Sequence, residues 1–292
     1  MSLDSTISKA STLIEALPYL QSFRGHTFLI KMGGSAMEDP ALVHKVMRDI
    51  VFLEVAGINP VVVHGGGKAI SAAMQEAGLK AEFIGGFRVT SPEAIDIVQT
   101  TLSDTINPGL VEMLTELGCK ATGLPGTTVF IGERIQATNN DGQQVDIGRV
   151  GQAIGCHLDA IQNAIDAETV PVISPLATEQ GTGKPLNVNA DLAAACLAKA
   201  LRATKLVYLS DVPGILSDPS DPSTLIPSIN HTEAQALIAD GTISGGMLPK
   251  ITSALDSLEH GVGKVHFIHG KTPHSLLLEI FTRSGIGTEI VS

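Results

Sequence analysis

PVVVHGGGKAI, residues 60–70, is the stretch that decides the fold of this chain. Its β-branched run Val61–Val63 predicts a buried strand, three glycines follow, and apolar residues then recur at helical spacing from Ile70. Strand, glycine turn and helix in this order aim free backbone N–H groups at an anion, and glycine permits the close approach that a Cβ would block. Glycine turns that bind nothing have the same order, so this stretch alone leaves both interpretations open.

The composition favours a globular α/β protein and argues against polyanions as partners. The chain has 292 residues, 43% of them hydrophobic, and a formal net charge of −11. This length suffices for one large domain or two smaller ones with a sizeable core. Its acidity disfavours binding to nucleic acid or to an anionic membrane surface, and no apolar run reaches the ~18 residues of a membrane span. Each Lys or Arg beside a glycine loop is therefore a candidate for binding an anionic substrate.

The cysteines and the N-terminus indicate a cytoplasmic protein. Cys119, Cys156 and Cys196 lie far apart in the sequence and form no C-x-x-C pair. We expect them to be small buried apolar residues in a reducing cytosol. The first residues, MSLDSTISKAST, lack the basic and apolar regions of a signal peptide.

Residues 5–23 predict an amphipathic helix that precedes the first strand. Leu13, Ile14, Leu17, Leu20 and Phe23 recur at helical spacing, and Pro18 is expected to kink or split the helix. The apolar face of such an appendage needs a partner. It can pack on its own domain or form a subunit contact, and we favour the contact.

Strands and helices alternate along the rest of the chain. We expect helices at the ranges 40–57, 92–117, 157–167, 192–201, 231–240, 245–260 and 273–281, and strands at 26–31, 61–63, 169–174, 204–210 and 264–269. Pro108 and Gly109 are candidates for interrupting the second helix, residues 81–90 predict a hairpin, and residues 119–150 predict a peripheral hairpin region without chemistry. The alternation predicts a three-layer αβα sandwich with a mainly parallel central sheet.

Two lysines stand beside glycine pairs at predicted strand ends and helix starts. Lys31 ends a strand before Gly33-Gly34, and Lys250 follows Gly245-Gly246 at the start of a helix. A lysine in a first or second turn opposes the helix dipole, which an anionic ligand would compensate. The alternative for Lys31 is a strand end in solvent.

Arg88 lies among apolar residues, either as a surface arginine with a buried stem or as a carboxylate clamp. Asn187 and Asp191 flank Asn189 at a helix start, where such residues are often simple caps.

Taken together, these residues favour phosphoryl transfer, a reaction that needs alignment and charge compensation more than covalent chemistry. The Walker A sequence, the protein-kinase H-R-D and D-F-G motifs and the dinucleotide motif G-x-G-x-x-G are all absent from the chain. A P-loop protein, a protein kinase and a dinucleotide-binding protein are therefore disfavoured.

Six motifs resemble those of the amino-acid kinase family over roughly residues 25–292: KMGG (31–34), VVHGGG (62–67), GFRVT (86–90), NVNAD (187–191), LSDVPGI (209–215) and GGMLPK (245–250). Single motifs are shared with carbamate kinase, aspartokinase, glutamate 5-kinase and uridylate kinase. The glycine triplet combined with GFRVT and NVNAD resembles the acetylglutamate kinases within that family.

The resemblance implies a role for each matching residue. Lys31 and Lys250 would hold the transferring phosphoryl group, Asp191 would orient both lysines, and the Gly34 and Gly66 amides would donate to its oxygens. Acetylglutamate would be bound by Gly66, Gly67, Arg88 and Asn187, with Arg88 on the α-carboxylate. ATP, used with Mg²⁺, would be bound by Asp211, Val212, Pro213, Gly214, Ile215, Leu216, Thr242, Ile243 and Ser244. The sequence has no cluster with the spacing of metal ligands.

The chain ends resemble the arginine-sensitive branch of the acetylglutamate kinases. In that branch an N-terminal helix with a segment like ALPYL, here residues 16–20, interlaces dimers into a hexamer. The resemblance implies an inhibitory L-arginine site at Lys205, His266, Glu279 and Gly285 and leaves binding of a PII signalling protein open. The chain departs from the common pattern at His269, where aspartate is expected, and at Lys68, where proline is usual.

The resemblance also implies a domain organisation and a reaction. Residues 1–24 would form a helical extension, about 25–185 an acetylglutamate-binding part and about 186–292 an ATP-binding part of one kinase domain. The expected reaction is phosphorylation of the γ-carboxylate of N-acetyl-L-glutamate by ATP, giving N-acetyl-L-glutamyl 5-phosphate in arginine biosynthesis. The alternatives are another carboxylate or carbamate kinase and an arginine-binding regulatory member that has lost catalysis.

Overall fold

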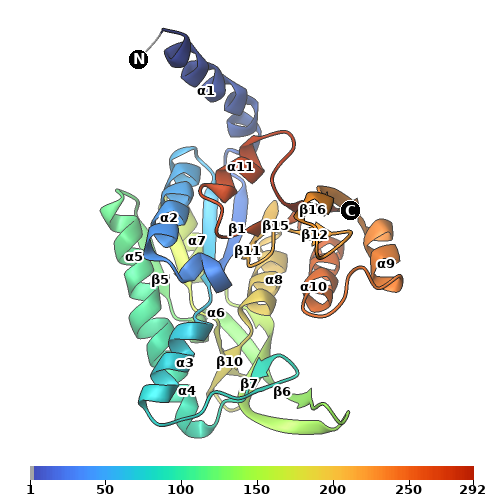
Figure 1. Ribbon diagram of the computed structural model, residues 1–292. Coiled ribbons are helices and arrows are strands. Elements are labelled where there is room, and N and C mark those ends of the chain that lie inside the picture. Colours follow the sequence, from blue (N-terminus) through green and yellow to red (C-terminus); the bar gives the residue numbers. More distant parts are fainter. Residues whose placement is uncertain (1–2) are drawn as a thin grey trace.

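The central sheet has eight strands and organises the molecule. The computed structural model describes residues 3–292 (Figure 1). In order across the sheet the strands are β14 (Ser228–Asn230), β16 (Thr288–Val291), β15 (Lys264–His269), β11 (Lys205–Ser210), β1 (Thr27–Met32), β2 (Asn59–His64), β8 (Val170–Ile173) and β5 (Ala121–Leu124). Neighbouring strands are parallel except β15 and β16, so the mainly parallel sheet predicted from the sequence is confirmed.

Two apolar cores lie on opposite faces of this sheet. Phe28, Ile30 and Met32 of β1 belong to one core, whereas Leu29 belongs to the other. Such alternation is what a strand buried on both faces requires. The first core is covered by α2 (Pro40–Val55), α5 (Asn107–Glu116) and α11 (Ser275–Phe281), and the second by α7 (Asp159–Asp166), α8 (Ala190–Leu201) and α10 (Met247–Glu259). The result is the expected three-layer arrangement.

Helix ends follow the expected local chemistry. The Asp39 side chain accepts from the Ala41 amide at the start of α2, where Pro40 is the first helical residue. Asn189 caps α8 in the same way, accepting from the amides of Asp191 and Leu192. The other α-helices after residue 26 are α3 (Gly67–Glu76), α4 (Pro92–Gln99), α6 (Gly126–Val129) and α9 (His231–Ala239), with short 3₁₀ turns η1 (Gly34–Met37) and η3 (Pro222–Thr224).

The predicted helix at residues 92–117 contains a π-helical segment. Helix α4 passes into the π-helix η2 (Thr100–Ile106), which continues into α5. The expected interruption at Pro108 and Gly109 is wrong, because the helix continues from η2 through both residues as α5.

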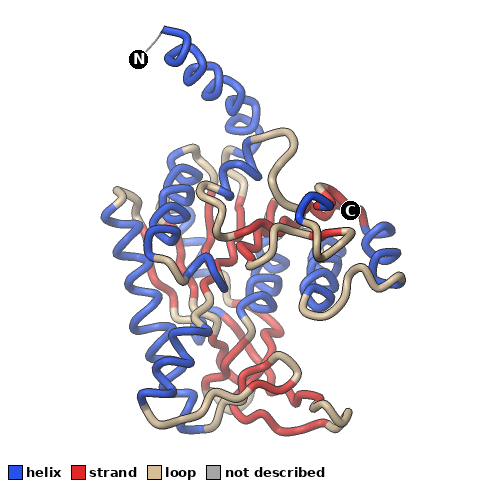
Figure 2. Tube along the Cα trace, in the orientation of Figure 1, coloured by secondary structure: helices blue, strands red, loops and turns tan. Residues whose placement is uncertain are grey.

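The hairpin predicted within residues 119–150 is confirmed, since residues 130–138 pair antiparallel with residues 144–156, but it belongs to a closed four-stranded barrel rather than to the periphery. The barrel consists of β10 (Pro185–Val188), β7 (Gln144–Cys156), β6 (Phe130–Thr138) and β9 (Leu176–Glu179). Figure 2 shows these strands below the central sheet. The predicted hairpin at residues 81–90 is confirmed as β3 (Phe83–Ile84) paired with β4 (Phe87–Arg88), and a second short pair joins β12 (Ile215–Leu216) to β13 (Leu225–Ile226).

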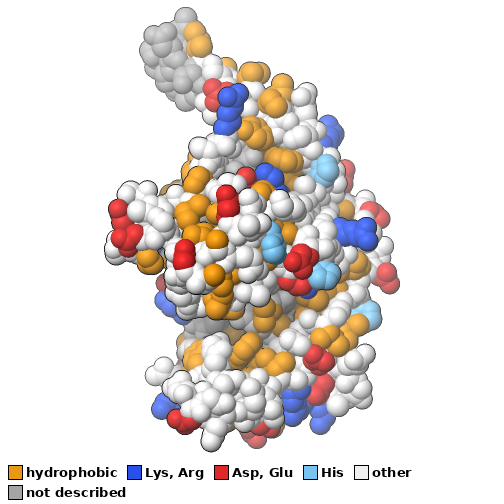
Figure 3. Space-filling view, turned by 90° about the vertical axis from the view of Figure 1, so that its right-hand side faces the viewer, with side chains coloured by type: hydrophobic (Ala, Val, Ile, Leu, Met, Phe, Trp, Pro, Cys, Tyr) orange, Lys and Arg blue, Asp and Glu red, His pale blue; other side chains and the backbone are white. Residues whose placement is uncertain are grey.

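Helix α1 (Leu3–Phe23) projects from the body of the molecule (Figure 1). It is one helix with Pro18 inside, so of the two predicted effects of this proline the splitting is wrong, and the kink stays a prediction. Its C-terminal end packs on the domain, where the Phe23 ring lies 5.2 Å from that of Phe28. Leu13 and Ile14 are 68% and 66% exposed, and hydrophobic side chains are visible on the helix in Figure 3.

The cysteines differ from the expectation. Cys119 is buried as predicted, but Cys156 and Cys196 are half-buried, and their sulfur atoms lie 3.6 Å apart. The contact arises because the end of β7 packs against α8. Among residues 3–292, no helix combines the length and apolarity needed to cross a membrane.

Candidate active site

Lys31, Asp191 and Lys250 form an ion-paired cluster, although they lie on three separate elements. Lys31 precedes the last residue of β1, Asp191 lies in the first turn of α8, and Lys250 lies near the start of α10. Lys31 Nζ is 2.7 Å from Asp191 Oδ1, and Lys250 Nζ contacts Asp191 Oδ2. The carboxylate therefore bridges two ammonium groups, as the resemblance implied.

The electrostatics of this cluster favour an ionised aspartate. Burial opposes the charge of Asp191, but attraction to Lys31 and Lys250 outweighs that effect and lowers the pKa of the carboxyl group. With one carboxylate between two ammonium groups, the cluster carries a net positive charge. It can therefore attract and orient a phosphoryl group.

Glycines let the backbone approach this cluster closely. A Cβ on Gly33 would overlap the Lys31 ammonium group. Gly34 has a φ of +53°, which favours glycine, and a Cβ there would overlap the Asp211 carboxylate. Gly66 caps the start of α3, where free amides and the helix dipole suit an anion.

A cavity of about 230 Å³ lies on the barrel side of the lysines and brings together Gly34, Gly66, Gly67, Arg88, Asn187 and Asp191. Arg88 is only 7% exposed, and its Nη2 donates to the Gly67 carbonyl (2.7 Å) and to Ser71 Oγ (2.9 Å). Burial lowers the pKa of this guanidinium from its ordinary value. The Asn187 side chain donates to Thr90 Oγ1, whose hydroxyl donates to the Arg88 carbonyl.

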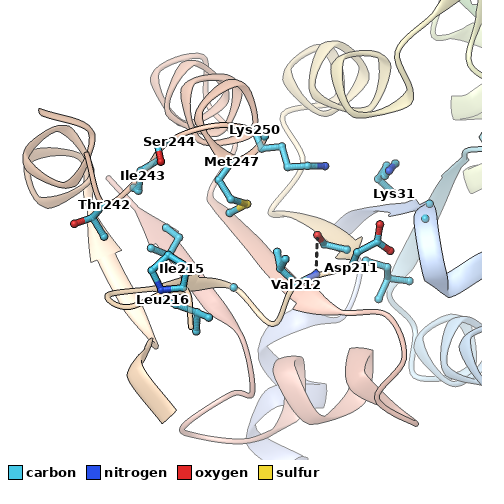
Figure 4. Close-up of a pocket in the computed structure, with 17 residues that line it drawn as sticks. Lys31, Asp211, Val212, Ile215, Leu216, Thr242, Ile243, Ser244, Met247 and Lys250 are labelled. Atoms are coloured by element: carbon cyan, nitrogen blue, oxygen red, sulfur yellow. Dashed lines mark hydrogen bonds between the residues drawn. The ribbon is translucent and has the colours of Figure 1, made fainter. Parts of the chain in front are cut away.

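A second cavity, of about 520 Å³, lies on the other side of the lysines. It is lined by Asp211, Val212, Gly214, Ile215, Leu216, Thr242, Ile243 and Ser244, whereas Pro213 of the same loop does not line it. Figure 4 shows Lys31 and Lys250 extending toward the same space, with the residues of both loops around it. The two cavities share Lys31, Gly33 and Gly34, so two ligands could meet at Lys31.

Several lining residues were not anticipated. Val150 of β7 lines the smaller cavity, so the barrel region expected to lack chemistry contributes to the site. Phe83 lies in the hairpin and places its ring 4.6 Å from the Arg88 guanidinium carbon. Met247 lines the larger cavity, and its place in GGMLPK beside Lys250 is the signal that could have identified it.

Comparison with known proteins agrees with this geometry. The model of the amino acid kinase family matches residues 26–269. The chain belongs to this family. It is 64% identical to the acetylglutamate kinase of Akkermansia muciniphila over 98% of this chain and 96% of that protein. It is 44% identical to the acetylglutamate kinase of Methanocaldococcus jannaschii over 99% and 98% of the two chains.

Solved structures of family relatives have the same fold. The N-acetylglutamate synthase of Neisseria gonorrhoeae, complexed with coenzyme A and N-acetyl-glutamate, superimposes with a TM-score of 0.83 at 28% identity, covering 97% of this chain and 63% of that one. The same enzyme complexed with coenzyme A and L-arginine gives a TM-score of 0.79 at 27% identity over 97% and 65% of the chains. This family member therefore has acetylglutamate kinase function (EC 2.7.2.8), phosphorylating N-acetylglutamate in arginine biosynthesis, and its kinase activity implies ATP.

The four residues assigned to arginine lie together in this amino acid kinase. Lys205, His266, Glu279 and Gly285 line one cavity of about 440 Å³, with Tyr19 and Phe23 of α1. Lys205 pairs with Phe28 in the sheet, whereas Lys31 pairs with Tyr208. Measured along the strands, Lys205 in this cavity therefore lies about three residues, or roughly 10 Å, from the level of Lys31, toward the amino ends of the strands.

Hydrogen bonds connect the polar side chains of that cavity. Lys205 Nζ lies 3.0 Å from His266 Nε2, and His266 Nδ1 lies 2.8 Å from Glu279 Oε1. Glu279 also accepts from the amides of Ile286 and Gly287. Burial lowers the pKa of Lys205 to about 8.

The two departures from the common pattern lie in the first turn of α3 and at the end of β15. Lys68 is exposed and forms an ion pair with Glu38 at 2.7 Å. His269 ends β15, and its Nδ1 accepts from the Lys271 amide.

Proposed function

We propose that Lys31 and Lys250 stabilise the phosphoryl group as it passes from ATP to the γ-carboxylate of N-acetylglutamate. The observation that carries this assignment is the meeting of the two cavities at Lys31, with Asp191 holding both lysines. The carboxylate is already ionised at neutral pH, so its attack requires no general base. Its oxygen bonds to the γ-phosphorus while the bond to the bridging oxygen of ADP breaks, giving N-acetyl-L-glutamyl 5-phosphate and ADP.

The smaller cavity is proposed to bind N-acetylglutamate. The buried Arg88 guanidinium is assigned to the α-carboxylate, because its planar donors suit bidentate binding. Asn187 and the amides of Gly66 and Gly67 are assigned to the remaining polar groups of the substrate. Gly66 and Gly34 are also assigned to the oxygens of the transferring phosphoryl group.

The larger cavity is proposed to bind ATP between the loops at 211–216 and 242–244. Pro213 acts there through the shape of its loop, since it does not line the cavity. Within residues 3–292 no group of three or more His, Cys, Asp or Glu side chains could hold a metal ion. Mg²⁺ prefers a few carboxylates plus substrate phosphates, so ATP would supply most of its ligands and Asp211 is the carboxylate of this cavity. When bound there, Mg²⁺ would neutralise phosphate charge.

The kinase assignment is tested by measuring ADP release with N-acetylglutamate as acceptor. Lys31→Ala is expected to lower kcat at least about 100-fold, the effect of losing one transition-state donor. Lys45→Ala, a lysine of α2 away from both cavities, is the matched control and should keep wild-type activity. Full activity in Lys31→Ala would refute the proposed mechanism. Measuring ADP release with carbamate as the acceptor tests the alternative that the chain is a carbamate kinase.

The cavity at Lys205, His266, Glu279 and Gly285 is proposed to bind L-arginine as a feedback inhibitor. The proposal is supported by the clustering of these residues and by the relative from Neisseria gonorrhoeae solved with L-arginine. Glu279 and Glu289 supply carboxylates that suit a guanidinium ligand. Glu279→Gln should abolish inhibition by L-arginine and keep kcat, and L-citrulline, which lacks the charge, should not inhibit wild type. Unchanged inhibition in Glu279→Gln would contradict this site.

The helical extension is proposed to join dimers into a hexamer. Support comes from the exposed apolar residues of α1, including Ile7, Leu13 and Ile14, which are each more than half exposed. Residues 25–185 and 186–292 are proposed as the acetylglutamate-binding and ATP-binding parts. Tyr19 and Phe23, at the C-terminal end of the extension, line the arginine cavity. Arginine bound there would therefore contact the helix that is proposed to join the dimers.

A further inference from the structure

A buried polar pair lies directly beneath the glycine loop of the active site. His64 is the last residue of β2 and is fully buried, and Asn107, at the start of α5, is 4% exposed. His64 Nδ1 lies 2.8 Å from the Gly65 carbonyl oxygen, and its Nε2 lies 3.2 Å from Asn107 Nδ2. Asn107 Nδ2 also donates to the Val172 carbonyl at 2.9 Å. A polar pair at this depth needs a reason, because burial of polar groups is costly.

These contacts define the tautomer of His64. A carbonyl oxygen can only accept, so His64 Nδ1 carries the hydrogen and donates to Gly65. Nε2 is then the acceptor for the Asn107 amide, which leaves every polar atom of the imidazole with a partner. Burial lowers the pKa of His64 to about 4, so the ring is neutral at neutral pH.

The hydrogen bond from His64 fixes the peptide group between Gly65 and Gly66. In a planar trans peptide the C=O and the N–H point in opposite directions. Since the Gly65 carbonyl is held toward His64 in the core, the Gly66 N–H points away from the core. Gly66 lines the smaller cavity, and no hydrogen bond among residues 3–292 uses its amide hydrogen.

The π-helix η2 supports the same loop from the other side. A Cβ built on Gly66 would lie 2.7 Å from Leu102 Cδ2 and 2.7 Å from Ile106 Cδ1, so both side chains of η2 contact the loop closely. Asn107 follows η2 immediately. Single-turn π segments occur frequently at functional sites, and here the segment presents Asn107 to His64.

We propose that His64 and Asn107 are positioning residues for phosphoryl transfer, holding the Gly65–Gly66 peptide so that the Gly66 amide donates to the phosphoryl group in the transition state. The inference rests on the proposed function, which assigns that donor role to Gly66. A glycine loop is otherwise free to rotate its peptide groups. The donor would then have to be oriented at the moment of reaction, which costs rate.

Two substitutions at His64 separate positioning from mere core filling. An asparagine amide nitrogen is as many bonds from Cα as imidazole Nδ1, so His64→Asn keeps the donor to Gly65. A glutamine amide nitrogen matches Nε2 instead, so His64→Gln loses that donor. For His64→Gln we expect kcat to fall about 10- to 100-fold, part of the effect of deleting a transition-state donor, with both KM values within about twofold. His64→Asn should recover most of kcat.

A transition-state mimic gives a second readout on the full-length protein. ADP with aluminium fluoride and N-acetylglutamate should bind His64→Gln more weakly by about the factor lost in kcat, while ATP alone binds as in wild type. If His64→Gln does not fold, Asn107→Leu, which removes the donor to Nε2, is measured in the same way with a smaller expected loss.

The outcomes are distinct. Equal kcat in His64→Gln, His64→Asn and wild type overturns the positioning role. Equal losses in both His64 variants, together with weaker ATP binding, indicate a structural role only and also overturn it. Full activity in Lys31→Ala would instead refute the proposed active site itself.

Discussion

Acidification should destabilise the protein through His64. The pKa of this buried imidazole is lowered to about 4 from an ordinary value of 6.5, with burial as the main cause and its bond to Gly65 acting in the opposite direction. On acidification the unfolded chain therefore takes up a proton before the folded one does. The free energy of unfolding should fall as the pH drops from 6.5 toward 4.

The magnitude follows from the size of this window. Each pH unit in which only the unfolded state binds the proton costs about 1.4 kcal/mol. Between pH 7 and pH 5, His64 alone should remove about 2 kcal/mol from the free energy of unfolding.

The assay is urea unfolding at pH 7 and pH 5, at one protein concentration because the protein is proposed to be oligomeric. His64→Asn is the control, since it fills part of the site and keeps the bond to Gly65 but cannot titrate. Other titrating groups, including His266, contribute equally to the pH dependence of stability in both proteins, so their contributions cancel in the comparison. A loss of stability on acidification that is the same in wild type and His64→Asn would refute the reasoning.

Three further predictions address the substrate site, the extension and the thiols. Arg88→Lys should raise the KM for N-acetylglutamate about 10- to 100-fold, because lysine cannot bind a carboxylate bidentately; a steady-state assay in which only the KM for ATP changes would contradict this. Removal of residues 1–24 should reduce the particle from a hexamer to a dimer by light scattering, and an unchanged mass would count against the role of α1. Hydrogen peroxide should join Cys156 and Cys196, whose sulfurs are 3.6 Å apart, with loss of two hydrogens and formation of water. Intact mass should register that loss in wild type and not in Cys196→Ser, and an unchanged wild-type mass would exclude the reaction.

The local elements of the fold could be predicted from the sequence because their causes are local. The β-branched run Val61–Val63 forms the buried β2, and Asp39 with Pro40 starts α2 as capping chemistry requires. The helix through Pro18 is the exception. The local rule that proline interrupts a helix predicted a kink or a split at Pro18, but α1 stays one helix through this residue.

The candidate site was predictable in part. Lys31 and Lys250 were recognisable because each stands beside a glycine pair, and both line the larger cavity. Nothing in the spacing indicated Val150, which reaches the smaller cavity only because β6 and β7 close a barrel with β9 and β10. The contact between Cys156 and Cys196 likewise depends on packing of β7 against α8.

The opening stretch illustrates the division between sequence and tertiary structure. By itself, PVVVHGGGKAI determined a strand, a glycine turn and a helix, because backbone conformation depends on neighbouring side chains. Only the tertiary structure decided that His64 donates to Gly65, that Asn107 supports His64, and that Asp191 joins Lys31 to Lys250. Apart from His64 and Gly65, which are neighbours in the chain, these partners lie tens to more than a hundred residues apart, and the sheet order and the register of its strands bring them together. Direction and distance between side chains remote in sequence arise from packing, which no local pattern encodes.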